Sequence, residues 1–170
     1  KEFIKQDGYP CVGAHTSANS RNICFGIFDD MFEDKTTENL AWGLNRYIET
    51  LKERKIDLIV LAGFLWLVPA SLVKTFPERI INIHPALLPK YGGKGMYGMN
   101  VHKAVKAAGE KESGLTIHFV NEKYDEGGYI FKAACKLEGD ETPEEIAQKV
   151  LKMEHEYFPK VVEKVLSRLT

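Results

Sequence analysis

The chain has 170 residues, of which 44% are apolar and 28% charged, and its formal net charge is −1. This composition is ordinary for one globular domain, which we place at residues 1–170, and such a length buries about two-thirds of the unfolded surface. The near-neutral charge predicts no nucleic acid partner, and no apolar run approaches the roughly 20 residues that cross a membrane.

The first 37 residues are hard to assign. Glu2–Asp7 resembles the end of a helix, and Tyr9–His15 and Asn22–Phe28 resemble strands. The polar stretch between those strands is too short for the crossover of about a dozen residues that parallel neighbours need. Either the two strands are not parallel neighbours, or residues of the biological chain are absent from this sequence.

From residue 38 onward the pattern alternates between helix and strand. Apolar residues at helical spacing predict a helix over 38–54: Leu40, Leu44, Ile48 and Leu51. The nearly all-apolar run Ile56–Ala62 predicts a strand covered on both faces, and Gly63 ends it. A short helical turn after Pro69 then leads into a strand at Ile80–His84.

The second half predicts further elements: a helix at 100–108 stopped by Gly109, and strands at Thr116–Val120 and Tyr129–Leu137 separated by the loop Asn121–Gly128. A capping box, with Thr142 as the N-cap and Glu145 as its partner, opens a C-terminal helix. Pro159 should kink or break that helix. The sequence therefore predicts a Rossmann-like α/β fold, with a mostly parallel sheet and helices on both faces.

The strand Ile80–His84 carries an amide and an imidazole two residues apart. Residues i and i+2 of a strand share a face, so Asn82 and His84 point together while Ile81 and Ile83 pack behind them. Pro85 lacks a backbone N–H and places the pair near the strand's C-terminal end, where open α/β sheets bind ligands. This pattern predicts a functional site.

Three cysteines, Cys11, Cys24 and Cys135, are widely spaced and form no C-x-x-C pattern. An odd number without such a pattern favours free thiols in a reducing cytoplasm and argues against a structural zinc site.

The segment from Asn82 to Gly93, Asn-Ile-His-Pro-x-Leu-Leu-Pro-Lys-Tyr-x-Gly, resembles the signature of the folate-dependent formyltransferases, and in particular of those that formylate glycinamide ribonucleotide. Three more motifs follow the family's order: Ala62–Leu65, Thr116–Val120 with Tyr124–Gly128, and Glu154-His155 with Phe158-Pro159. Together they cover about residues 38–168. The resemblance implies the formyltransferase fold.

The resemblance also implies an activity, namely transfer of the formyl group of 10-formyltetrahydrofolate to the amine of glycinamide ribonucleotide in purine biosynthesis. Tetrahydrofolate would be a co-substrate, no metal is implied, and the partners would be these small molecules, with the protein a monomer or homodimer. The family's first strand and its glycine-rich phosphate loop are not found. The stretch 16–20 is a weak substitute without glycine, so we expect the strand and loop to lie upstream.

Formyl transfer needs oxyanion stabilisation and a route for the amine's proton. Asn82 and His84 offer N–H donors for the oxyanion, and neither is a good nucleophile, which favours direct transfer through a tetrahedral intermediate. The resemblance makes Asp125 the third catalytic residue. A carboxylate beside His84 would raise the imidazole's pKa, favour its charged form and relay the proton.

The resemblance assigns the remaining site residues. The acceptor would be bound by Pro85, His118 and Glu154, with His118 supporting the Asp125 loop and Glu154 binding the amino end. The folate would be bound by Leu65, Trp66, Leu67, Val68, Asn121, Glu122 and Tyr124. The glycine-rich segment 90–95 either closes over a phosphate or is a flexible loop. His102 and His155 are interpreted as ordinary structural histidines.

Other functions stay open at this point. A formyltetrahydrofolate deformylase and a sugar N-formyltransferase belong to the same superfamily, although Leu-Leu-Pro-Lys-Tyr disfavours the deformylase. A catalytically silent folate- or nucleotide-binding module is the alternative from a different class.

Overall fold

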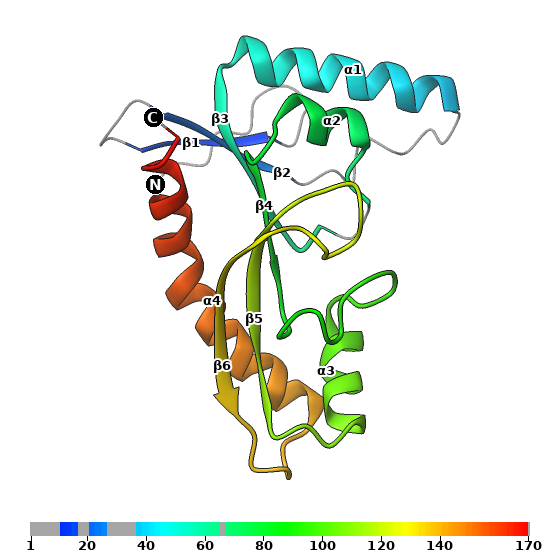
Figure 1. The fold of residues 1–170 in the computed structure, drawn as a ribbon, viewed down its shortest axis with the longest axis vertical. Coiled ribbons are helices and arrows are strands. Elements are labelled where there is room, and N and C mark those ends of the chain that lie inside the picture. Colours follow the sequence, from blue (N-terminus) through cyan, green and yellow to red (C-terminus); the bar gives the residue numbers. More distant parts are fainter. Residues whose placement is uncertain (1–10, 17–20, 27–36, 65–66, 170) are drawn as a thin grey trace.

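The computed structural model describes residues 11–16, 21–26, 37–64 and 67–169. They form one sheet in the order β1-β2-β3-β4-β5-β6, flanked by helices (Figure 1). The elements are, in chain order, β1 (Cys11–Thr16), β2 (Arg21–Gly26), α1 (Thr37–Glu53), β3 (Ile56–Ala62), α2 (Ala70–Thr75), β4 (Ile80–His84), α3 (Met99–Ala107), β5 (Glu112–Phe119), β6 (Tyr129–Lys136) and α4 (Pro143–Leu166).

The predicted α/β class is confirmed, but the sheet is mixed rather than mostly parallel. β3 pairs in parallel with β2 and with β4, whereas β1–β2, β4–β5 and β5–β6 are antiparallel. Short connections explain two of the antiparallel pairs, because a few residues can only join strands as a hairpin. The antiparallel β1–β2 pair also confirms that the two N-terminal strands are not parallel neighbours. The predicted helix end at Glu2–Asp7 lies outside the described residues.

Alternating side chains of β3 divide the core into two layers. Leu58 and Val60 pack on the α4 side of the sheet, whereas Ile59 and Leu61 pack with α1 and α2. Both faces of the central strand are therefore buried, which is why its sequence is a continuous apolar run. This arrangement confirms the predicted helices on both faces.

The capping box of α4 is present as predicted. The Glu145 backbone N–H donates to Thr142 Oγ1 at 3.2 Å, and the Thr142 N–H donates to the Glu145 carboxylate at 2.7 Å. Of the predicted kink or break at Pro159, the break is wrong, because α4 continues through the proline to Leu166. The proline removes one helical hydrogen bond, but the residues after it stay helical because their apolar side chains are buried on the sheet: Val161, Val162, Val165 and Leu166.

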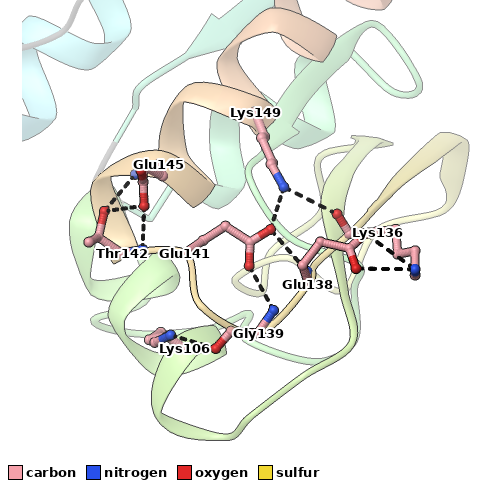
Figure 2. A network of polar contacts seen from close by, with 8 residues as sticks. All are labelled: Lys106, Lys136, Glu138, Gly139, Glu141, Thr142, Glu145 and Lys149. Atoms are coloured by element: carbon pink, nitrogen blue, oxygen red, sulfur yellow. Dashed lines mark hydrogen bonds and ion pairs between the residues drawn. The ribbon is translucent and has the colours of Figure 1, made fainter.

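A buried carboxylate fastens the turn between β6 and α4. Glu141 accepts hydrogen bonds from the backbone N–H groups of Glu138 at 3.0 Å and Gly139 at 2.9 Å, and forms an ion pair with Lys149 of α4 (Figure 2). The hydrogen bond from Lys149 and then those from the two backbone N–H groups lower the pKa of Glu141 to about 2. The ionised carboxylate thus ties the turn to the helix.

We expect Glu141→Gln to lower the melting temperature at pH 7. Because the folded pKa lies below the ordinary value of 4.5, the contribution of the ionised carboxylate is complete above about pH 5 and is lost as the pH falls toward about 2. Circular dichroism melts from pH 7 to pH 3 should show the difference between variant and wild type narrowing. Glu163→Gln, which changes an exposed acid of α4, is the control; an equal loss in both variants would contradict the prediction.

Candidate active site

A cavity of about 830 Å³ lies beside the end of β4, between α4 and the segment 93–99. Six residues predicted from the sequence line this cavity: Asn82, His84, Pro85, Tyr124, Asp125 and Glu154. They come from β4, from the loop after β5 and from α4, so segments about 70 residues apart in the chain meet in one wall. The structure thus brings the three predicted catalytic residues together.

Strand geometry places the polar pair as the sequence predicts. Ile81 and Ile83 are buried in the core on the α4 side, while Asn82 and His84 reach the cavity. In the antiparallel register of β4 and β5, Asn82 lies opposite His118. The Nδ2 atom of Asn82 is 3.4 Å from Nε2 of His118, so β5 contributes a second imidazole to the cluster.

Tight backbone packing brings Asp125 to this cluster. Asp125 has φ +54°, in the left-handed region that aspartate tolerates better than most residues. A Cβ on Gly127 would lie 1.6 Å from the carbonyl oxygen of Phe119, so only glycine permits the loop to return this close to β5. Gly93 then donates its backbone N–H to Asp125 Oδ2 at 2.8 Å, which fixes the carboxylate from the other side.

The Asp125 carboxylate lies between two histidines. Its Oδ1 atom is 3.6 Å from His84 Nδ1 and 3.5 Å from His118 Nε2. All three side chains are largely buried. A carboxylate shared by two imidazoles in a water-poor site can exchange protons with either ring.

Backbone carbonyls determine which nitrogen of each ring carries hydrogen. The Nε2 of His84 lies 2.7 Å from the Tyr91 carbonyl oxygen, and Nδ1 of His118 lies 2.8 Å from the Phe119 carbonyl oxygen. A carbonyl only accepts, so both of these nitrogens donate. In its neutral form His84 therefore carries its lone pair on Nδ1, the atom that faces Asp125.

The segment that carries the Tyr91 carbonyl is anchored by Thr116 of β5. The Thr116 hydroxyl donates to the Ala86 carbonyl oxygen at 2.7 Å and accepts from the Leu88 N–H at 3.0 Å. Lys132 of β6 also donates to the Leu88 carbonyl oxygen. Neighbouring strands thus hold the chain after His84 in the course that brings Tyr91 back to the ring.

Asp125 does raise the pKa of His84 as predicted, but the expectation that the charged form is therefore favoured is wrong. Burial lowers the pKa of His84 and outweighs the opposing effect of the Asp125 charge. Burial alone would likewise raise the pKa of Asp125, but the hydrogen bond with His118, the His84 charge and the Gly93 N–H together lower it. A neutral His84 beside an ionised Asp125 is the expected state near pH 7.

Glu154 contributes a second carboxylate to the cavity. Burial raises the pKa of Glu154 and exceeds the lowering effect of His155. Among the described residues its side chain has no hydrogen-bond or ion-pair partner. A partly buried carboxylate without a protein partner is suited to a ligand that donates hydrogen bonds or carries positive charge.

Several predicted ligand residues lie elsewhere. Leu67 is 44% exposed, and Val68 is buried in the core cluster with α1 and α2, so neither side chain lines the cavity. Glu122 forms an exposed ion pair with Lys74 at 3.4 Å, and Asn121 Oδ1 accepts the N–H of Lys123. Leu65 and Trp66 lie outside the described residues, as does most of the stretch 16–20.

The cavity wall also contains residues that the sequence analysis did not select, among them Tyr97, His102 and Gln148. The sequence predicts an ordinary structural histidine at position 102, yet His102 lies in the same wall as His84. Helical spacing alone does not reveal that the first turn of α3 faces the site, because the preceding glycine-rich segment determines where the helix begins.

No group of three or more His, Cys, Asp and Glu side chains in the described ranges is arranged to hold a metal ion. Of the three cysteines, the structure describes the side chain of Cys135, which is a free thiol. None of the helices in the described part of the chain is both long and apolar enough to cross a membrane.

Comparison of the sequence with known proteins identifies the family to which the chain is similar. The pattern of the formyl transferase family matches residues 12–162. The chloroplastic phosphoribosylglycinamide formyltransferase of Vigna unguiculata is 47% identical over 153 residues, which are 90% of this chain and 47% of that protein. The phosphoribosylglycinamide formyltransferase of Bacillus subtilis is 36% identical over 156 residues, which are 92% of this chain and 77% of that protein.

Solved structures agree with these relatives. The crystal structure of phosphoribosylglycinamide formyltransferase from Bacillus halodurans superposes with a TM-score of 0.71 at 33% identity, covering 83% of this chain and 69% of that one. The chain spans less than half the length of the plant relatives that it matches. The matched pattern covers most of this chain, the relatives are similar to it in sequence, and the solved structure is similar to it in fold. The chain belongs to the formyl transferase family, among the phosphoribosylglycinamide formyltransferases.

Proposed function

We propose that this protein transfers the formyl group of 10-formyltetrahydrofolate to the amino group of glycinamide ribonucleotide. The observation that carries the proposal is the cluster of Asn82, His84 and Asp125 in the wall of one cavity, with His118 in contact with Asn82 and Asp125. An amide donor beside a carboxylate between two imidazoles suits an oxyanion and a moving proton. The identity of the acceptor is inferred from the names of the relatives, which are phosphoribosylglycinamide formyltransferases.

The bond changes follow from these groups. The amine lone pair attacks the formyl carbon, and the carbonyl electrons move onto oxygen. One N–H of Asn82 faces His118, so its second N–H is available to stabilise the oxyanion. His84 already donates its Nε2 hydrogen to Tyr91, so Asn82 is the principal oxyanion donor. Collapse of the intermediate breaks the bond to N10 of tetrahydrofolate.

The leaving N10 needs a proton, and the amine nitrogen, which becomes positively charged when it bonds to the formyl carbon, must lose one. Neutral His84 presents the lone pair of Nδ1 toward Asp125, so the ring can take the amine's proton while Asp125 stabilises the imidazolium that forms. The same proton then passes to N10. His118 acts through Asp125, whose ionised form it favours.

The two substrates occupy different parts of the cavity. Glu154 of α4, a carboxylate without a protein partner, binds the acceptor next to Pro85. The backbone of residues 65–68 and the loop Asn121–Tyr124 bind the folate, with Tyr124 in the cavity wall. Because the Val68 side chain is in the core, any contact of that residue with folate comes from its backbone.

The location and assembly of the protein remain sequence-based predictions, namely the cytoplasm and a monomer or homodimer. The plant relatives carry the word chloroplastic in their names.

The acceptor assay tests the function. The protein with 10-formyltetrahydrofolate and glycinamide ribonucleotide should produce tetrahydrofolate and the formylated nucleotide in equal amounts, and no product without the nucleotide. Chromatography of the nucleotide and an assay for free formate measure the two outcomes. Formate release with water as the only acceptor would replace the proposal with a deformylase.

Asn82→Ala and Asp125→Ala should each lower kcat by on the order of 10²-fold or more, the usual cost of losing an oxyanion donor or proton-transfer partner. Glu126→Ala is the matched control, because Glu126 is exposed and pairs with Lys123 instead of the cluster. Steady-state rates are compared after circular dichroism verifies that the variants fold. Turnover near wild type in either catalytic variant would refute the mechanism.

The protonation of His84 gives an independent test. Burial places its pKa below 6.5 in the wild type, and the Asp125 charge opposes that shift. Asp125→Asn removes the opposing charge, so the pKa of His84 should fall further in that variant. Nuclear magnetic resonance titration of the ring nitrogens measures both values. A rise of the pKa in Asp125→Asn would show that the carboxylate does not interact with His84 as described.

A further inference from the structure

Tyr91 has a backbone conformation that bulky residues rarely adopt, and the proposed mechanism uses only its carbonyl. Its φ is +57°, in the left-handed region, where a residue with a large side chain is strained. Residues other than glycine persist in this region only where the surrounding contacts fix them, and they are concentrated at functional sites. The conformation of Tyr91 therefore indicates that the backbone at this position has a specific role.

The turn at Tyr91 directs two backbone groups toward the catalytic cluster. The Tyr91 carbonyl oxygen lies 2.7 Å from Nε2 of His84, and the N–H of Gly93, two residues later, donates to Asp125 Oδ2 at 2.8 Å. One short segment thus contacts both the histidine and the carboxylate of the proposed proton transfer. A displacement of this segment would disturb both groups at once.

The two neighbours of the His84 ring favour different positions for its hydrogen. Asp125 Oδ1 lies 3.6 Å from Nδ1 and, as an acceptor, favours a hydrogen on Nδ1. The Tyr91 carbonyl favours a hydrogen on Nε2, and its contact of 2.7 Å is much shorter. The neutral ring therefore carries its hydrogen on Nε2 only while the Tyr91 carbonyl stays in place. Without that carbonyl the hydrogen would move to Nδ1, and this atom would lose the lone pair that accepts the amine's proton.

The side chain of Tyr91 is anchored at both ends, and it does not line the cavity. Its ring packs against a buried apolar cluster that includes Val101 and Val105 of α3. Its hydroxyl donates to Glu110 Oε1 at 2.8 Å, and the Lys90 ammonium reaches the same oxygen at 2.8 Å. The Lys90 side chain is 66% exposed, so water weakens its ion pair. The hydrogen bond from the phenol to Glu110 is therefore the main polar anchor of Tyr91.

We propose that Tyr91 and Glu110 are positioning residues for the reaction. Glu110 holds the phenol, and the phenol holds the left-handed backbone of Tyr91. That backbone sets the hydrogen of His84 on Nε2 and, through Gly93, fixes the Asp125 carboxylate. The effect of Tyr91 and Glu110 on turnover rests on the proposed function, whereas their control of the His84 tautomer does not.

Nuclear magnetic resonance of the His84 ring nitrogens tests the positioning without any substrate, with His84 assigned from the signals lost in His84→Gln. At about pH 8, where the ring is neutral, wild-type Nε2 should give the signal of a protonated nitrogen and Nδ1 that of a bare one. In Tyr91→Phe and in Glu110→Ala the two signals should shift toward each other, because the form with hydrogen on Nδ1 becomes populated. A hydrogen on Nδ1 in the wild type would overturn the proposal, whether or not any variant folds.

Tyr157→Phe is the matched control for this measurement. The Tyr157 ring contacts Phe131 and Lys160, and its hydroxyl has no hydrogen-bond partner among the described residues. Loss of that hydroxyl should leave the His84 signals unchanged. Signals that are unchanged in Tyr91→Phe and Glu110→Ala as well would overturn the proposal.

Steady-state kinetics with 10-formyltetrahydrofolate and glycinamide ribonucleotide test the consequence for turnover. Tyr91→Phe and Glu110→Ala should each lower kcat by about tenfold, as for loss of a hydrogen bond to a charged group, with little change in either KM. Glu110→Gln keeps an acceptor for the phenol and should recover most of the rate. Glu112→Gln, which changes an exposed acid two residues further along, is the charge control. An equal loss in Glu110→Gln and Glu110→Ala, or a rise of KM with kcat unchanged, would overturn the positioning role.

The double variant Tyr91→Phe with Glu110→Ala tests whether the two residues act as one unit. Both single changes break the same hydrogen bond, so the double variant should lose no more rate than the more affected single variant. Losses that multiply would overturn the proposal. A changed His84 tautomer in a protein without formyl transfer would retain the positioning and refute the proposed function. Formyl transfer at the wild-type rate, with an unchanged tautomer in both single variants, would do the reverse.

Discussion

The antiparallel pairing of β4 with β5 is the constraint on which the site depends. It sets Asn82 opposite His118 and His84 opposite Thr116, so one strand pair supplies both the polar cluster and its support. The hydroxyl of Thr116 holds the chain after β4, and the Tyr91 carbonyl of that chain determines which nitrogen of His84 carries hydrogen. A register shift of one residue would turn these side chains to the other face of the sheet. The chemistry of the cavity is therefore a consequence of strand register.

Burial governs the electrostatics of this cluster. A carboxylate next to an imidazole normally favours the charged ring, but His84 is buried deeply enough that desolvation has the larger effect on its pKa. Asp125 stays ionised because hydrogen bonds and nearby rings compensate its own burial. Polar atoms without partners are also concentrated here: Asn82 Oδ1 and His102 Nδ1 both lie in this wall.

Much of the fold follows from local pattern. The bounds of β3 and β4 agree with the apolar runs, the capping box opens α4, and the alternation at Asn82 and His84 correctly places Ile81 and Ile83 in the core. The errors arise where distant contacts outweigh local preference. Pro159 does not end α4, because the apolar residues beyond it are buried on the sheet. The antiparallel direction of the β4–β5 pair likewise depends on how the long connection between the two strands crosses the sheet, which residue spacing does not report.

The sequence by itself determined the fold class, the family resemblance, and the pairing of Asn82 with His84 at a strand end, because each depends on neighbours within a few residues or on an ordered motif. Only the tertiary structure decided how those groups work together. It placed Asp125 between two histidines, directed the lone pair of His84 to Nδ1, removed Val68 from the cavity and brought His102 into its wall. These outcomes depend on burial, register and packing between segments far apart in the chain, and no local pattern encodes such distances.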